Sequence, residues 1–122
     1  MIRKKYCVDG AWLESKTEKW IPVTDSSTGA VIAEVPSCTQ NEVLAAIDAA
    51  DRAFPAWSQM SLSKRTQLLF HWRNVLMEHL EELTLLCARE LGKTLNEARG
   101  DVLKAIEPTE LACATPYLTQ GA

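Results

Sequence analysis

The sequence lacks the glycine-rich loops with which many proteins hold phosphate groups. It contains no G-x-G-x-x-G pattern and no P-loop, and only 5 of its 122 residues are glycine. It also lacks G-x-S-x-G, the turn that presents the nucleophilic serine of many hydrolases. These absences exclude a nucleotide-phosphate cradle and an esterase-type serine from these residues.

Paired metal or disulfide ligands are also lacking. No C-x-x-C motif occurs, and the four cysteines lie far apart along the chain: Cys7, Cys38, Cys87 and Cys113. This spacing favours reduced thiols, so we expect a cytoplasmic protein without a zinc or disulfide framework. His71 and His79 are too far apart to ligate one metal from a single helix, and we expect both in core or boundary positions.

Long apolar runs and an excess of positive charge are absent. The 13 basic and 16 acidic side chains give a net charge of -3, which argues against a nucleic-acid surface. No stretch approaches the roughly 20 apolar residues that a membrane-spanning helix needs. With 47% hydrophobic and 24% charged residues, the composition is that of one ordinary globular domain with neither nucleic acid nor membrane as a partner.

Short β-type runs and turn residues fill the first part of the chain, residues 1–36. Two hairpins are predicted: one pairs residues 6–8 with 11–13, and the other pairs residues 20–24 with 30–35. The connecting sequences, Asp-Gly and Asp-Ser-Ser-Thr-Gly, are rich in turn formers.

Residues 37–122 are predicted to be mainly helical, so the expected fold class of the chain is α+β. A capping box of Thr39 and Glu42 starts the first helix near Gln40, and Pro55 is expected to end it near Phe54. The apolar face predicted to enter the core of this helix comprises Val43, Ile47, Ala50, Phe54 and Trp57.

A second helix is expected from Ser61 or Ser63 to Gly92, and a third after the capping box of Thr94 and Glu97. Pro108 is expected to kink the third helix. The second helix carries one apolar stripe of Leu69, Trp72, Leu76, Leu80, Leu83 and Cys87, and a neighbouring stripe of Leu68, Val75, His79 and Leu86. So wide an apolar face needs partners on two sides, which favours packing surface outside these residues. The alternative is a self-contained helical bundle with a broad core.

Several stretches together resemble NAD(P)-dependent aldehyde dehydrogenases. The similar residues are Val8 to Trp12, Ser27 to Pro36, Ala45 to Ala50, Ala53 to Ser58 and Glu90 to Thr94. The stretch from Asn96 to Val102 is similar to one branch, the CoA-acylating methylmalonate-semialdehyde dehydrogenases. Essentially the whole chain is covered by this resemblance.

The resemblance implies a part of an enzyme, because family members are several times longer. Their catalytic cysteine and glutamate and their dinucleotide-binding units come later in the chain, so no catalytic or cofactor-binding residue is expected here. Residues 1–122 would form the N-terminal part of the cofactor-binding region of an α/β fold. NAD, with CoA or water as the acyl acceptor, is expected for the parent enzyme only.

Two sites are implied by the resemblance. A structural monovalent cation in the family corresponds to the carbonyls of Val23 and Thr24 and the carboxylate of Glu90, although Glu90 also fits an ordinary helix end. In the methylmalonate branch an arginine binds the substrate carboxylate, and Lys104 stands at that position. Lysine keeps the charge but loses the bidentate geometry of arginine.

Two hypotheses therefore stand. In the first, the chain is the N-terminal segment of an aldehyde dehydrogenase, inactive alone, and its apolar helix faces pack on the remainder of that enzyme. In the second, it is an autonomous helical interaction or oligomerisation module derived from the family, which binds itself or a partner through its exposed Leu and Trp side chains.

Overall fold

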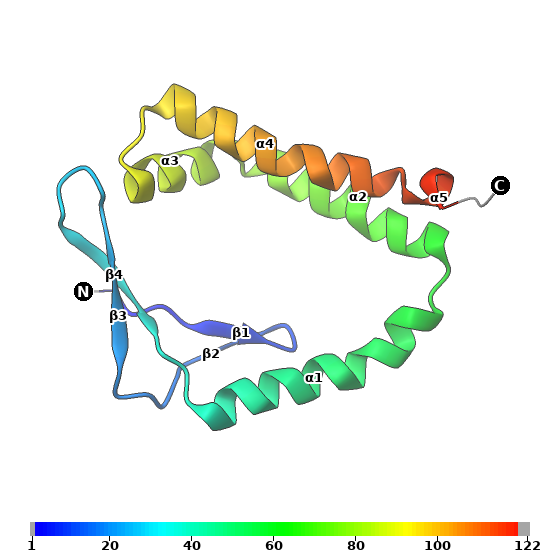
Figure 1. The fold of residues 1–122 in the computed structure, drawn as a ribbon, viewed down its shortest axis with the longest axis horizontal. Coiled ribbons are helices and arrows are strands. Elements are labelled where there is room, and N and C mark those ends of the chain that lie inside the picture. Colours follow the sequence, from blue (N-terminus) through cyan, green and yellow to red (C-terminus); the bar gives the residue numbers. More distant parts are fainter. Residues whose placement is uncertain (1, 120–122) are drawn as a thin grey trace. The chain divides into compact units, whose positions relative to one another are not determined.

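The computed structural model describes residues 2–119, shown as a ribbon in Figure 1. The chain divides into two compact units, residues 1–58 and 59–122. Among the described residues, all strands precede all helices in the sequence. The expected α+β class is confirmed.

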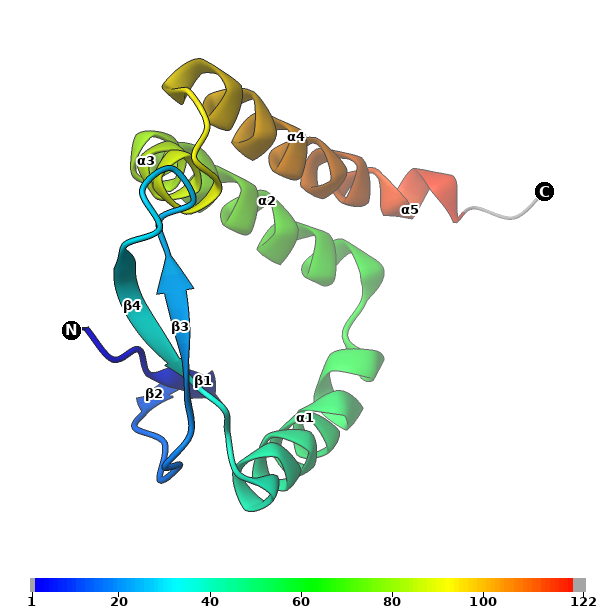
Figure 2. The ribbon, with the colours of Figure 1, turned by 60° about the vertical axis from the view of Figure 1, so that its left-hand side comes forward.

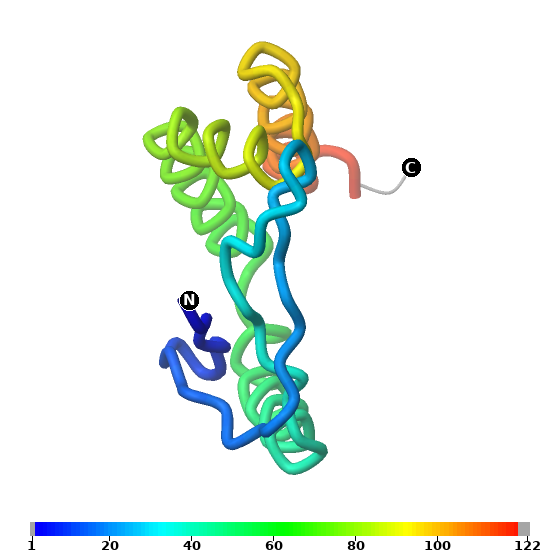
Figure 3. Tube along the Cα trace, turned by 90° about the vertical axis from the view of Figure 1, so that its left-hand side faces the viewer, coloured from blue at the N-terminus to red at the C-terminus, as the bar shows by residue number. Residues whose placement is uncertain are grey.

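The strands of the first unit form two separate antiparallel hairpins. β1 (Tyr6–Val8) pairs with β2 (Ala11–Leu13), and β3 (Trp20–Thr24) pairs with β4 (Val31–Pro36), the two adjacent traces in Figure 3. The β1–β2 turn has positive φ at both central positions, Asp9 and Gly10, as its Asp-Gly sequence favours. Both predicted hairpins are confirmed.

The β3–β4 turn is organised by Asp25. Its Oδ1 accepts a 2.8 Å hydrogen bond from the Ser27 amide, and its carbonyl accepts one of 2.8 Å from Gly29, which has a φ of 72°. The outer edge of β4 pairs with the N-terminal segment, since the Lys4 amide donates to the Glu34 carbonyl over 2.8 Å. A local register shift follows Val23 in β3.

The helix α1 (Gln40–Gln59) begins where the capping box predicts. The Glu42 carboxylate accepts a 2.7 Å hydrogen bond from the Thr39 amide, and the Thr39 hydroxyl accepts one of 3.4 Å from the Glu42 amide. The predicted end near Phe54 is wrong, because α1 continues through Pro55 for another turn. The fixed φ of proline is compatible with a helix, and the ring removes one hydrogen bond without stopping the chain.

The predicted core face of α1 is also wrong for the described residues, because no residue of this helix is buried. Ile47 is 58% exposed and Phe54 is 63% exposed. A long amphipathic helix whose predicted core residues are all exposed is unusual, since such a face normally drives the packing of the helix. Among the described residues of the first unit, the buried hydrophobic side chain is that of Ala33 in β4.

The second unit contains α2 (Leu62–Glu78), α3 (Leu80–Leu91), α4 (Leu95–Cys113) and α5 (Thr115–Leu118). The Ser61 hydroxyl caps α2 through a 3.4 Å hydrogen bond from the Lys64 amide. The expected single helix up to Gly92 is wrong, because the backbone leaves helical geometry at His79, with φ of −98° and ψ of 13°. Gly92 ends α3 with a left-handed φ of 65°, as predicted.

α4 packs against both α2 and α3, as Figure 2 shows. The buried apolar residues at this contact are Leu80, Ala98, Ile106 and Cys113. α4 starts at the predicted capping box and continues past Pro108 to Cys113. In the apolar stripe that contains Leu80, the side chains of Leu76, Leu83 and Cys87 lie near α4, although Trp72 is 54% exposed. In the other stripe, Leu68 and Leu86 are each 49% exposed.

Candidate functional site

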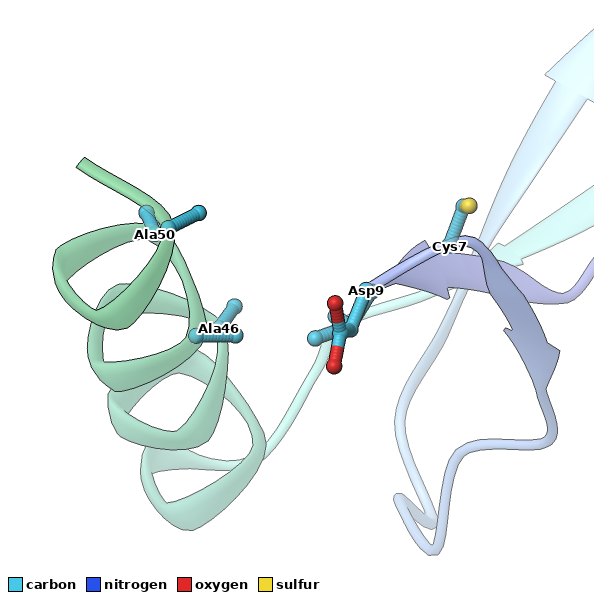
Figure 4. Close-up of a pocket in the computed structure, with 7 residues that line it drawn as sticks. Cys7, Asp9, Ala46 and Ala50 are labelled. Atoms are coloured by element: carbon cyan, nitrogen blue, oxygen red, sulfur yellow. The ribbon is translucent and has the colours of Figure 1, made fainter. Parts of the chain in front are cut away.

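Hollows in the first unit lie between the β1–β2 hairpin and α1. One has a volume of about 270 Å³, and Figure 4 shows Ala46 and Ala50 of α1 on one side of it and Cys7 and Asp9 on the other. A neighbouring hollow of about 380 Å³ includes Cys38 in its lining. Alanine dominates the lining of the first hollow, whereas the second adds Tyr6 and Glu42 to its aliphatic side chains. The Glu42 carboxylate is part of the helix cap of α1, so these hollows provide few free groups for chemistry.

A third hollow, of about 360 Å³, lies among α2, α3 and α4 in the second unit. Its lining is aliphatic, with Leu76, Leu83 and Ile106 on three different helices and Asp101 as its charged member. Asp101 is already engaged by the ammonium of Lys93. This arrangement favours apolar packing over the binding of a polar ligand.

The turn between α3 and α4 is held by its own residues. The Lys93 amide donates a 3.2 Å hydrogen bond to the Ala88 carbonyl, and its ammonium pairs with Asp101, which raises the pKa of Lys93. The Glu97 carboxylate accepts hydrogen bonds from the hydroxyl and amide of Thr94 at 2.8 and 3.2 Å, and these lower the pKa of Glu97. The side chains of this turn therefore have structural partners of their own.

Lys104 lies on an exposed face of α4. Its side chain is 78% exposed, and its Nζ is 3.5 Å from Oε2 of Glu107, one helical turn further along. An exposed ammonium with a single distant partner retains donors for another anion. The placement is compatible with binding a carboxylate, and that role stays a prediction.

The three residues of the predicted cation site fall in different parts of the chain. Val23 and Thr24 lie at the end of β3, beside the register shift, and Glu90 lies near the C-terminus of α3. Backbone carbonyls and a carboxylate are hard oxygen ligands, which suit a monovalent or divalent hard cation. Because these residues belong to the two different units, the cation site stays a prediction.

The described residues, 2–119, contain neither a metal-ligand cluster nor a buried histidine. Among residues 2–119, no three histidine, cysteine, aspartate or glutamate side chains gather closely enough to hold a metal ion. His71 and His79 are both exposed, so their expected core or boundary placement is wrong. His79 directly precedes α3, and its Nδ1 lies 2.9 Å from Oε2 of Glu82. The imidazole therefore contacts a carboxylate at the surface and does not pack in the core. The free cysteines range from the exposed Cys7 to the buried Cys113.

Sequence reasoning missed a second role of Glu42. Beyond its capping box, its carboxylate accepts a 2.8 Å hydrogen bond from the Ser15 hydroxyl and one of 2.7 Å from the Lys16 amide. With the bond from Thr39, these contacts lower the pKa of Glu42 to about 2. The partners are 26 and 27 residues away in sequence, so no local pattern could have revealed them.

Comparison with known proteins shows to which protein family the chain belongs. Residues 12–121 match the profile described as "Aldehyde dehydrogenase family". The chain belongs to this family. The resemblance of the motifs to aldehyde dehydrogenases is therefore confirmed.

Two similar proteins of this aldehyde dehydrogenase family act, by their names, on semialdehydes. The chain is 42% identical over 121 residues to a malonate-semialdehyde dehydrogenase of Listeria monocytogenes, covering 98% of this chain and 25% of that protein. It is 39% identical over 117 residues to the mitochondrial, acylating methylmalonate-semialdehyde/malonate-semialdehyde dehydrogenase of Rattus norvegicus, covering 96% of this chain and 22% of that protein. The chain thus spans about a quarter of the length of these relatives.

A solved structure has the same fold as this chain. It is described as a methylmalonate-semialdehyde dehydrogenase of Sinorhizobium meliloti 1021 in complex with NAD, and it matches with a TM-score of 0.93 at 24% identity. The match covers 100% of this chain and 25% of that one. At this identity the similarity shows the fold alone.

Within residues 2–119, no helix combines the length and apolarity needed to cross a membrane.

Proposed function

We propose that this chain is the N-terminal part of a longer aldehyde dehydrogenase that oxidises a carboxylate-bearing aldehyde with NAD. One observation carries the proposal: the family match extends over residues 12–121, yet the semialdehyde dehydrogenases that the chain resembles are about four times as long. On this view the described residues supply scaffold and part of the substrate environment, and the reacting groups lie in the remainder of the enzyme.

The described residues do not fit a dinucleotide site of their own. Such a site needs a parallel strand, a glycine-rich turn and a helix whose N-terminus meets the phosphates. The strands here are two antiparallel hairpins, and the sequence has no glycine-rich turn of that type. We therefore expect NAD to bind the remainder of the enzyme and the isolated 122-residue chain to be inactive.

The apolar faces of the helices would pack on the remainder of the enzyme. The predicted core face of α1 is exposed throughout, and on α2 the side chains of Phe70 and Trp72 are each 54% exposed. Apolar area of this kind is normally buried in a folded domain. Contact with the remainder of the enzyme would bury this exposed apolar area.

The site residues keep the roles that the resemblance implies. Lys104 would bind the carboxylate of the substrate as a point charge, with less geometric selectivity than an arginine. Val23, Thr24 and Glu90 would hold a structural monovalent cation through oxygen ligands. We propose a cytoplasmic enzyme, with CoA or water as the acyl acceptor.

The test compares two polypeptides that contain this sequence. One is the native polypeptide from its own cells, and the other is the isolated chain of residues 1–122. Each is mixed with NAD and malonate semialdehyde, with and without CoA, and NADH formation is followed by absorbance. The proposal predicts NADH only from the native polypeptide, and NADH from the isolated chain would contradict it. A requirement for CoA decides the acyl acceptor.

A second candidate function is an autonomous oligomerisation module. It is favoured by exposed leucine and tryptophan side chains such as Leu68, Leu86 and Trp72. Static light scattering of the isolated chain separates the two. A stable oligomer of one defined size supports the module, whereas polydisperse association supports a part separated from its enzyme.

A further inference from the structure

The acidic residues of α4 differ in how firmly they are held. Glu97 is bound by Thr94 at 2.8 Å and Asp101 is paired with Lys93. Glu110 is held by Arg73 at 2.7 Å. Glu107 has a looser pairing, because its Oε2 lies 3.5 Å from the ammonium of Lys104 and its side chain is 61% exposed.

The basic residues of the same helix divide in the same way. Arg99 is joined to Glu81 of α3 at 2.9 Å, so its guanidinium is occupied by a contact between helices. Lys104 has the distant contact with Glu107, at a separation longer than an N–H···O hydrogen bond. Within α4, Lys104 is therefore the cation that an incoming anion can recruit at least cost.

Space for that anion lies on the N-terminal side of Lys104. Gly100 stands one turn before it, and a Cβ placed on Gly100 would meet no heavy atom within 4 Å. Helical side chains lean toward the N-terminus of their helix, so Lys104 can turn from Glu107 toward Gly100. The ion pair with Glu107 opposes this movement.

We propose that Glu107 competes with the substrate carboxylate for the ammonium of Lys104, and that it affects substrate selectivity through this lysine. This inference rests on the proposed function, in which Lys104 binds the carboxylate of an aldehyde substrate. While Glu107 is ionised it partly neutralises the ammonium, and it repels an arriving carboxylate. The enzyme therefore discriminates less between aldehydes with and without a carboxylate than Lys104 alone would allow.

The experiment uses the native full-length polypeptide and its Glu107→Gln variant. For each, kcat/KM is measured for malonate semialdehyde and for propanal, which has the same number of carbons and no carboxylate. E107Q is expected to raise the ratio of the two values about two- to fivefold, the effect of one exposed charge pair, through a lower KM for malonate semialdehyde. The gain is expected to shrink at high salt, because salt screens exposed charges.

Two further variants serve as controls. Glu107→Asp keeps the charge and is expected to keep a ratio close to that of the unsubstituted enzyme. Glu18→Gln removes the same charge from an exposed residue of the first unit and is expected to leave the ratio unchanged. A ratio that is unchanged in E107Q, as an equal change for both aldehydes would leave it, or a lowered ratio, would overturn the inference.

Failure of the proposed function gives a different result. If the unsubstituted native polypeptide oxidises neither aldehyde, the proposed function is wrong. The inference is then tested by calorimetric binding of malonate, a dicarboxylate probe, to the native polypeptide. Tighter binding to E107Q than to the unsubstituted protein supports competition at Lys104, and equal binding overturns it.

Discussion

Oε2 of Glu42 accepts a 2.8 Å hydrogen bond from Oγ of Ser15, which lies 27 residues earlier in the chain. The same carboxylate closes the capping box of α1 through the Thr39 amide and binds the Lys16 amide. One side chain therefore joins the segment before β3 to the start of the first helix. Within α1 no residue is buried, so this polar contact is one of the interactions that hold the N-terminus of the helix in place.

Replacing Glu42 is expected to destabilise the first unit in a pH-dependent way. The pKa of Glu42 is lowered to about 2, chiefly by the Lys16 and Thr39 amides, so its contribution is complete above its unfolded pKa near 4.5. It is lost progressively as the pH falls from there toward 2. Glu42→Gln should unfold at lower urea concentration at pH 7 and differ less from the unsubstituted protein near pH 2. Glu18→Gln is the control, and equal effects of the two substitutions would contradict the prediction.

Removing the cap of α4 is expected to destabilise the second unit. Thr94→Ala removes the hydroxyl that accepts a 3.3 Å hydrogen bond from the Glu97 amide, which should cost about 1 kcal/mol of unfolding free energy. Thr94→Ser retains the hydroxyl and should recover most of the loss. The measurement is the urea unfolding midpoint of the three proteins, and an alanine variant as stable as the serine variant would show that the cap contributes nothing.

Thr84 and Thr66 form a matched pair of buried threonines with opposite expectations. Within the described part of the chain, the Thr84 hydroxyl lacks a hydrogen-bond partner at 3% exposure, whereas the Thr66 hydroxyl donates a 2.9 Å bond to the Leu62 carbonyl. Thr84→Val should raise the unfolding free energy by about 1 kcal/mol, because valine has a similar shape and no polar atom to bury. Thr66→Val should show no such gain. Equal unfolding midpoints for the two variants would refute this account of Thr84.

Local signals in the sequence predicted the elements well. Asp-Gly and Asp-Ser-Ser-Thr-Gly placed both hairpins, and the boxes starting at Thr39 and Thr94 placed the starts of α1 and α4. These motifs succeed because turn and cap residues satisfy backbone groups within three or four positions of themselves. Gly92 ended α3 for the same reason, by adopting the left-handed conformation that closes a helix.

The errors arose where the outcome depends on more than local chemistry. The apolar stripe runs through His79 without changing its period, so periodicity gave one helix where there are two; the acidic Glu81 and Glu82 that follow were the available sign of a new helix start. Pro55 does not end α1, because proline has a helix-compatible φ and removes a single backbone hydrogen bond. The candidate site depended on family resemblance, because exposed residues such as Lys104 leave no periodic signal.

The central claim, that this sequence is part of a longer aldehyde dehydrogenase, is tested most directly by the intact mass of the native polypeptide. The native polypeptide is isolated from its own cells with an antibody against residues 1–122, and its intact mass is measured by mass spectrometry. Because the chain covers about a quarter of its relatives, we predict a mass about four times the 13.6 kDa of these residues. A native mass of 13.6 kDa would contradict the account and direct attention to what the exposed helices bind.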